Sequence, residues 1–127
     1  MSDLIQSGER ADLVRAYFRA YEEDDRAALE AIVAPDFTFS SPHDRIDRAA
    51  YFTRCWPGHE IIRRFHIDRL YVLGDEAVVR YRAERYEGEP FHCTEFFTLR
   101  DGKVAAVEVY FGRMPADLMA AAAKGAT

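Results

Sequence analysis

Three side chains of this sequence suit proton transfer near neutral pH: His66, His92 and Asp68. The ordinary pKa of histidine lies closest to neutrality among the side chains, so an imidazole can give or take a proton there. Asp68 stands two residues after His66, which puts both on one face of an extended strand and lets the carboxylate orient the imidazole. We expect these three residues to act as acid and base, although a histidine at a sheet end can equally be a hydrogen-bonded structural residue.

A second candidate set lies in a loop. His43 and Asp44 directly follow Pro42, which closes a short alternating segment. They could serve at the mouth of a pocket in place of the strand histidines, or they could form only a solvated turn.

Residue spacing does not indicate other kinds of site. No two histidines are spaced like ligands on one helix face or in a short loop, so we expect no metal. The two cysteines are far apart and fit reduced packing thiols better than a disulfide or a zinc site. Without a glycine-rich phosphate loop or a nucleophile elbow, we also expect no cofactor. The residues concerned are His43, His59, His66, His92, Cys55 and Cys93.

The strands that position the candidate residues are organised around a hairpin. Asp101-Gly102 separates two runs rich in valine, threonine and aromatic residues, and this dipeptide favours a type I′ turn. If these are the two loop residues, Arg100 pairs with Lys103, and alternation then sorts the side chains by face. The face that we expect to be buried carries His92, Thr94, Phe96, Thr98, Ala105, Val107, Val109 and Phe111.

The opposite face of the hairpin brings two carboxylates together. Glu95 lies across from Glu108 in this register, which is unfavourable unless a cation is near. Extending the register across the preceding turn pairs Tyr86 with Phe91 and puts Arg82 beside Glu95. A guanidinium between two carboxylates relieves their repulsion. We call Arg82, Glu95 and Glu108 the charged row and expect it on the outer face, where it suits solvent or a partner subunit.

The rest of the chain predicts an α+β fold. Aromatic and aliphatic side chains recur at helical spacing over residues 9–23, and further helices follow Asp24-Asp25 and Asp47. The expected strands are residues 36–41, 61–73 and 76–87, and a short helix begins at Pro115. We expect a curved antiparallel sheet with three helices packed on one face. The buried face gains Val79, Tyr81 and Ala83, and also Val72, Leu70, Asp68 and His66 unless the Gly74-Asp75 turn is one residue longer.

Composition and charge exclude some classes of protein. A length of 127 residues suits one domain, and a formal net charge of -5 without a basic cluster argues against binding to nucleic acid. The first turns carry several charged residues and no apolar run, so neither a signal peptide nor a spanning helix is expected. We therefore expect a cytoplasmic protein that does not bind membranes.

The chain resembles the NTF2-like superfamily, and within it the SnoaL-like and ketosteroid-isomerase-like proteins. The resemblance rests on the order of elements over residues 9–111, on Asp36-Phe37-Thr38-Phe39-Ser40-Ser41-Pro42 and on Arg100-Asp101-Gly102-Lys103-Val104. It implies one domain over residues 1–127 shaped as a cone, with three N-terminal helices over the concave sheet face, an apolar pocket and a homodimer through the sheet. The fold hosts isomerases, cyclases, hydrolases, dehydratases and binding modules, so it does not define a reaction.

The resemblance also allows the chemistry to be checked residue by residue. Ketosteroid isomerases use a first-helix tyrosine as a donor to the developing oxyanion, and Tyr17 matches it. Their general-base aspartate is replaced by Ser41, and their second donor, a protonated aspartate, falls near Thr94. A serine hydroxyl without an activating base cannot take a carbon-bound proton, so steroid isomerisation of that type is not expected. Related epoxide hydrolases use an arginine with carboxylates, a role open to the charged row if the sheet were inverted.

The leading expectation is a small SnoaL-like enzyme that moves a proton on an apolar, for instance polycyclic or polyketide-like, molecule without a cofactor. His92 or His66 would be the base, and Tyr17 would hydrogen-bond the enolate. The alternative is a non-catalytic module that binds a hydrophobic ligand or acts as a homodimeric interaction domain. The side chains expected to line the pocket, which could equally be ordinary core, are Tyr21, Phe39, Ser41, His43, Tyr51, Trp56, Tyr81, Thr94, Phe96, Val107, Val109 and Phe111.

Overall fold

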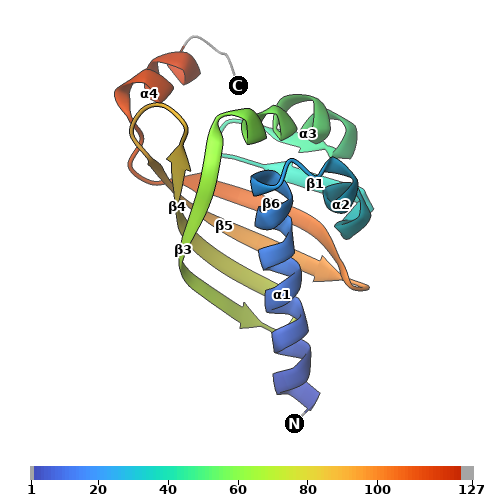
Figure 1. The fold of residues 1–127 in the computed structure, drawn as a ribbon. Coiled ribbons are helices and arrows are strands. Elements are labelled where there is room, and N and C mark those ends of the chain that lie inside the picture. Colours follow the sequence, from blue (N-terminus) through green and yellow to red (C-terminus); the bar gives the residue numbers. More distant parts are fainter. Residues whose placement is uncertain (1, 124–127) are drawn as a thin grey trace.

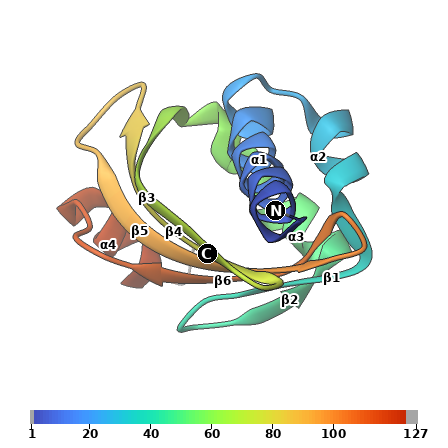
Figure 2. The same ribbon diagram turned by 90° about the horizontal axis from the view of Figure 1, so that it is seen from below.

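A computed structural model describes residues 2–123 of the chain, and the side chains of residues 8–120. The expected helices and strands are present (Figure 1), with β2 as an additional strand that Figure 2 labels. The helices are α1 (Ser2–Glu22), α2 (Arg26–Ile32), α3 (Arg48–Arg54), the 3₁₀ helix η1 (Trp56–Glu60) and α4 (Ala116–Ala123). The strands are β1 (Val33–Ser40), β2 (Arg45–Asp47), β3 (Ile62–Leu73), β4 (Glu76–Arg85), β5 (Phe91–Arg100) and β6 (Lys103–Phe111).

Two helices begin where the sequence predicts a cap. The Asp25 carboxylate accepts a hydrogen bond from the backbone N–H of Ala28 at 3.0 Å and starts α2. Asp47 does the same for Ala50 at 2.9 Å and starts α3. Each carboxylate satisfies a backbone donor that the first helical turn leaves unpaired.

The sheet curves around the first helix. Its six strands lie in the order β2-β1-β6-β5-β4-β3, and every neighbouring pair is antiparallel except β1 and β6. The expected antiparallel sheet is therefore mixed, because β1 runs parallel to the last strand. Viewed from below, α1 lies inside the curve and α4 on the outer side of the sheet (Figure 2). This is the α+β cone that the sequence predicts.

The hairpin turn is confirmed, but its register changes one residue further on. Asp101 and Gly102 both have positive φ, 54° and 73°, and Arg100 pairs with Lys103. Such a turn favours glycine at its second position because a positive φ carries no steric penalty there. After Leu99 pairs with Val104, a bulge intervenes, and Thr98 pairs with Ala106 instead of Ala105.

The connection between β4 and β5 also differs from the prediction. Arg82 pairs with His92, three positions before the expected partner Glu95. The register of β5 differs from the prediction by three residues against β4 and by one residue against β6. Both numbers are odd, so the two faces of β5 are exchanged relative to the prediction, whereas those of β4 and β6 are not. Its buried side chains are Cys93, Glu95, Phe97 and Leu99, whereas Phe96 and Thr98 are exposed and His92 and Thr94 half-buried.

The charged row does not form, and its prediction is wrong. Glu95 pairs with Val79 and Val109 on the concave side of the sheet, which faces α1. Glu108 is exposed on the outer side, where it pairs with Phe96. The inversion of β5 separates the two carboxylates without any need for a cation between them.

A second bulge decides the faces of β3. Ile67 pairs with Tyr81 and Arg69 with Arg80, so Asp68 is an extra residue on β3 and is exposed. Leu70 and Val72 pack against the core as predicted. The placement of His66 and Asp68 on the buried face is wrong, because the extra residue reverses the alternation beyond it.

Aromatic side chains fill the space between α1 and the sheet. Phe18 of α1 contacts Phe65, Tyr81 and Phe97, with ring centroids 4.9, 5.1 and 5.8 Å away. Edge-to-face pairs of this kind add to the stability that buried area provides. Within residues 2–123, no helix combines the length and the hydrophobicity needed to cross a membrane.

Candidate functional site

A carboxylic acid lies at the centre of the concave face. Glu95 is only 5% exposed, and among the described residues it is the one polar or charged residue that is buried as a whole. Its Oε2 accepts a hydrogen bond from the Tyr81 hydroxyl on β4. Its Oε1 is buried without a hydrogen-bond partner among the described residues. A buried polar atom without a partner is costly, and native proteins keep few of them.

Burial sets the protonation state of this acid. Removal from water raises the pKa of Glu95 to about 7, and the hydrogen bond from Tyr81 opposes part of that rise. An acid with a pKa near 7 exists in both protonation states at neutral pH. This is the property that general acid and base catalysis requires of a side chain.

Three tyrosines form a hydrogen-bonded chain beside this acid. The Tyr51 hydroxyl on α3 lies 2.6 Å from that of Tyr17 and 2.5 Å from that of Tyr21. Tyr17 and Tyr21 stand one helical turn apart on α1, and Tyr17 packs edge-to-face on Phe97 with centroids 5.1 Å apart. The negative charge of Glu95 contributes to a raised pKa of Tyr17 and of Tyr21.

The phenols of this cluster are neutral donors. Burial is the main cause that raises the pKa of Tyr17, Tyr21, Tyr51 and Tyr81 above the ordinary value of 10.0. A neutral phenol in a water-poor site can stabilise a negatively charged oxygen that develops in a reaction. A carboxyl of intermediate pKa beside such donors is suited to forming and quenching an enolate. Within the described part of the chain, no group of three or more His, Cys, Asp or Glu side chains is arranged to hold a metal.

Many of the predicted pocket residues do meet here. Buried in the core are Tyr17, Tyr21, Tyr51, Trp56, Tyr81, Val107 and Val109. Phe39 is partly buried, and its ring centroid lies 5.2 Å from that of Tyr51. Helical spacing and strand alternation thus predicted correctly that these side chains are buried. The same reasoning assigned Glu95, which lies among them, to the opposite face of the sheet.

The predicted acid–base residues lie elsewhere. His66 pairs with Arg82 across the strands, and its Nε2 lies 2.9 Å from Oε1 of Glu84. His92 also pairs with Arg82, on the face opposite Glu95, and its Nδ1 is buried without a partner among the described residues. The prediction that these histidines face the interior is wrong. The bulge between Ile67 and Arg69 changes the face of His66, and the altered registers of β5 change the face of His92.

The other five predicted contacts lie at the edge or outside. Thr94 pairs with Arg80 and Tyr110 on the outer face, and Phe96 on the same face is exposed. The expectation that these two line an interior pocket is wrong for the same reason. Phe111 is exposed at the end of β6, where the ring of His43 stacks at 6.5 Å. Ser41 and His43 belong to the loop that joins β1 to β2, where the Ser41 hydroxyl accepts a hydrogen bond from the backbone N–H of His43.

The sequence-based prediction left Glu95 out of the leading candidate site and gave it a catalytic role only as part of the charged row, if the sheet were inverted; one further signal pointed to Glu95. The predicted register put Glu95 directly across from Glu108, an unfavourable like-charge pair. That conflict had two solutions: a neighbouring cation, or a β5 strand with its faces exchanged. The structure has the second one.

The sequence comparison identifies the family. Residues 14–107 match the SnoaL-like domain family, so this chain belongs to it, as the sequence motifs suggested. No curated protein is similar enough in sequence to count as a relative.

Solved structures share the fold at low sequence identity. A protein from Kribbella flavida DSM 17836 is 23% identical with a TM-score of 0.76, and the match covers 90% of this chain and 95% of that one. A proposed ketosteroid isomerase from the same organism is 20% identical with a TM-score of 0.73, covering 86% and 82%. A proposed polyketide cyclase from Sinorhizobium meliloti is 28% identical with a TM-score of 0.66, covering 77% and 93%.

Proposed function

We propose that this protein is an enzyme that moves a proton on a small apolar carbonyl compound without a cofactor, as isomerases and cyclases do. The observation that carries the proposal is Glu95, a buried acid with a pKa of about 7 and one oxygen that has no hydrogen-bond partner in the described part of the chain. The activities proposed for the Kribbella and Sinorhizobium proteins belong to the same class of chemistry.

The proposed reaction uses Glu95 as both base and acid. Its carboxylate takes a proton from the carbon next to the carbonyl, the C–H bond breaks, and the electron pair moves to the carbonyl oxygen to give an enolate. A hydroxyl of the tyrosine chain, with Tyr17 as the expected donor, hydrogen-bonds that oxygen. Protonated Glu95 then returns the proton to the same carbon or to another carbon of the conjugated system, and the enzyme is regenerated.

The surroundings of Glu95 favour an apolar substrate. Cys93, Phe97 and Val109 adjoin it on the concave face, and all three are buried. A site of this kind binds mostly through apolar contact, with a few polar groups that fix the orientation of the ligand. The carbonyl oxygen would then meet the phenols and the acidic carbon would meet Glu95.

Deuterium exchange tests the proposal without a known cognate substrate. Enolisable ketones such as 2-decanone and 1-tetralone are incubated with the protein in D₂O, and loss of the α-proton signal is followed by NMR. We expect exchange above the buffer rate with the natural protein and a loss of about 10²-fold or more with Glu95→Gln. Glu108→Gln, which removes an exposed carboxylate of β6, is the matched control and should exchange like the natural protein.

Equal exchange by the Glu95→Gln and natural proteins would remove Glu95 from the mechanism. Exchange at the buffer rate by all three proteins would instead support a second candidate function, a non-catalytic module that binds an apolar ligand. That alternative rests on Ser41 and Thr94, which stand where ketosteroid isomerases carry their two carboxylates. Binding of the same ketones with no exchange would establish it.

We also propose that a second copy of this chain covers the outer face of the sheet. Phe96 and Tyr110 are 40% and 49% exposed there, and their rings pack edge-to-face with centroids 5.7 Å apart. Exposed apolar side chains that cluster in this way are typical of interaction surfaces.

A further inference from the structure

Three arginines lie together on the outer face of β3 and β4. Arg69 pairs with Arg80 across the two strands, and Arg82 follows Arg80 by two residues, so strand alternation puts all three on one face. Tyr81, which stands between Arg80 and Arg82 in the chain, is buried on the concave side, so the arginines are on the outer side. Arg69 and Arg80 are exposed and Arg82 is half-buried. We call these three residues the arginine cluster; the pairing of the two strands assembles it.

The arginine cluster lacks matching acids. Like charges directly opposite each other on neighbouring strands repel, so the pairing of Arg69 with Arg80 is unfavourable unless an anion lies between them. Among the residues whose side chains the structure describes, none of the three arginines forms an ion pair. The next residue of β4 on this face, Glu84, is already engaged, because its carboxylate contacts His66 at 2.9 Å and Arg63 at 3.5 Å. The cluster is thus a local excess of positive charge in a chain whose formal net charge is -5.

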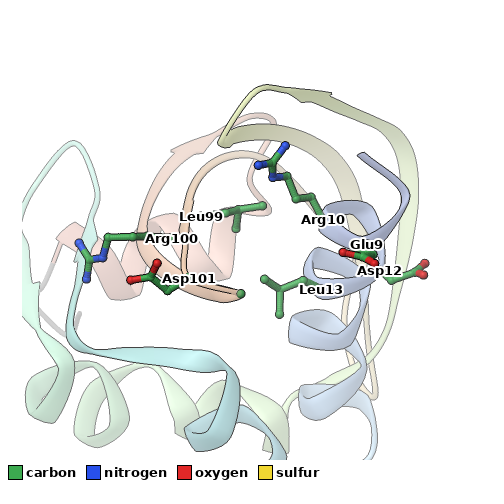
Figure 3. A pocket seen from close by; sticks show the side chains of 8 residues that line it. Glu9, Arg10, Asp12, Leu13, Leu99, Arg100 and Asp101 are labelled. Atoms are coloured by element: carbon green, nitrogen blue, oxygen red, sulfur yellow. The ribbon is translucent and has the colours of Figure 1, made fainter. Parts of the chain in front are cut away.

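A second place where arginines gather has balanced charges. A hollow of about 510 Å³ lies between the N-terminal half of α1 and the tip of the β5–β6 hairpin (Figure 3). Its lining includes two arginines and three acids, which are Arg10, Arg100, Glu9, Asp12 and Asp101. An anionic ligand would meet carboxylates in the hollow, whereas the arginine cluster offers it cations alone.

An apolar pair adjoins the arginine cluster on the same two strands. Tyr71 on β3 pairs with Val78 on β4, which is the position on the outer face before Arg80. Tyr71 is 57% exposed, and its hydroxyl accepts a hydrogen bond from Nη1 of Arg69 at 3.3 Å. Along β4 the outer face therefore presents an apolar side chain and then two arginines, in steps of about 7 Å.

The curvature of the sheet favours an extended chain as the ligand of this surface. The sheet wraps around α1, so its outer face is convex and does not enclose a small molecule (Figure 2). Alternate side chains of an extended segment lie about 7 Å apart, so they match successive positions on β4. Arginine suits carboxylates, because its guanidinium binds them through two parallel N–H donors. Anionic membranes attract larger clusters, of about four to eight basic residues.

We propose that the arginine cluster and the Tyr71–Val78 pair dock an extended acidic segment of a partner protein, in which an apolar residue is followed two and four positions later by Asp or Glu. The apolar side chain packs on Tyr71 and Val78. The first carboxylate bridges Arg69 and Arg80 and ends their repulsion, and the second binds Arg82. The surface is on the face opposite Glu95, so the inference does not depend on the proposed reaction. It uses β3 and β4, whereas the proposed homodimer uses Phe96 and Tyr110 on β5 and β6.

Titration with two matched peptides tests the docking surface. The ¹⁵N–¹H spectrum of the natural protein is followed while a blocked peptide, Ser-Leu-Ser-Glu-Ser-Glu-Ser, is added up to millimolar concentration. The matched control is the same peptide with Gln in place of both Glu residues. We expect the acidic peptide to shift the amide signals of Arg69, Arg80 and Arg82, and the Gln peptide to leave them in place. Raising NaCl to about 0.5 M should weaken the binding, because the charges are close to solvent.

A variant then tests the central arginine. We expect Arg80→Gln to raise the dissociation constant of the acidic peptide by about threefold or more, the effect of one exposed ion pair. Arg15→Gln is the matched control, because it removes a half-exposed positive charge of α1 and should bind the peptide like the natural protein. Both peptides are compared on the natural protein, so the titration decides the question even if Arg80→Gln fails to fold.

Several results would overturn the docking surface. Equal shifts with the two peptides, no shift with either, or an unchanged dissociation constant in folded Arg80→Gln would each do so. Shifts of the same size with inorganic phosphate would mean that the cluster binds small anions without preference for a segment. Sedimentation with phosphatidylglycerol vesicles that Arg80→Gln abolishes would assign the face to a membrane. A change of oligomeric state in Arg80→Gln, measured by light scattering, would assign it to a second copy of the chain.

Discussion

Tyr81 donates a hydrogen bond to Glu95 across the diagonal between β4 and β5. The two residues are not partners in the ladder, because Tyr81 pairs with Cys93 and Glu95 pairs with Val79. Diagonal neighbours on one face are close enough for long side chains to meet. The bond satisfies one carboxylate oxygen, and the other has no partner among the described residues. Glu95 is thus held in place but not fully stabilised as an anion.

This arrangement makes the free energy of unfolding depend on pH. The folded-state pKa of Glu95 is raised from 4.5 to about 7, so below pH 4.5 the acid is protonated in both states and carries no penalty. Between pH 4.5 and 7 the unfolded chain loses this proton while the folded chain keeps it. Stability should therefore fall as the pH rises through this window and then level off, by about 3 kcal/mol in total from this group.

Urea unfolding of the natural and Glu95→Gln proteins at several pH values checks this prediction. The difference in stability between them should grow in favour of Glu95→Gln from pH 4.5 to pH 7. Glu108→Gln should follow the natural protein throughout. A constant difference over this range would mean that the pKa of Glu95 is not raised.

The rate of the proposed exchange should report the same group. Glu95 must be ionised to take a proton, so kcat/KM for a ketone should rise with pH and level off above about 7, the pKa of the acid. The pH profile of deuterium exchange with 2-decanone gives this value. A profile with its midpoint near the ordinary pKa of a glutamate would indicate that the acid ionises in a wetter environment than the structure has.

Removal of the central hydroxyl of the tyrosine chain should destabilise the fold. Tyr51→Phe leaves the hydroxyls of Tyr17 and Tyr21 buried without the partner that they share. We expect a loss of about 1–3 kcal/mol of unfolding free energy. Tyr110→Phe, which removes an exposed hydroxyl 3.2 Å from Glu108, is the control and should change stability little. Equal stabilities of the two variants in thermal unfolding would contradict the prediction.

The histidines of β3 and β5 should be dispensable for exchange. The Nε2 atom of His66 lies 2.9 Å from Oε1 of Glu84, and His92 lies on the face opposite Glu95. We expect His66→Ala and His92→Ala to keep deuterium exchange within about threefold of the natural rate, since neither side chain is placed to reach a substrate beside Glu95. Loss of exchange in a variant with a native circular dichroism spectrum would return the acid–base role to that histidine.

A charge on the outer face should disrupt the proposed homodimer. Phe96→Glu puts a carboxylate next to Glu108 on the surface that we expect a second copy to cover. Light scattering at several protein concentrations should show a dimer for the natural protein and a monomer for the variant. Leu73→Glu, at an exposed strand end, serves as the control. An unchanged dimer in Phe96→Glu would place the interface elsewhere.

Local sequence signals determined the elements of this protein. Asp25 and Asp47 cap helices and Asp101-Gly102 forms a tight turn, since each of these structures depends only on residues close in the chain. The spacing of Tyr17 and Tyr21 also predicts correctly which side of α1 is buried, because the period of a helix fixes its faces. The family resemblance and the fold followed from these elements.

Tertiary structure decided which side chains form the candidate site. A strand alternates with a period of two, so a single additional residue in a bulge or a loop exchanges its faces. The bulges at Thr98/Leu99 and Ile67/Arg69 are features of the pairing between neighbouring strands, which the local sequence does not reveal. They move Glu95 into the interior and His66 out of it. The sequence by itself determined the fold and the burial of most of the aromatic side chains. The registers of the sheet determined that Glu95 is the acid that lies among them.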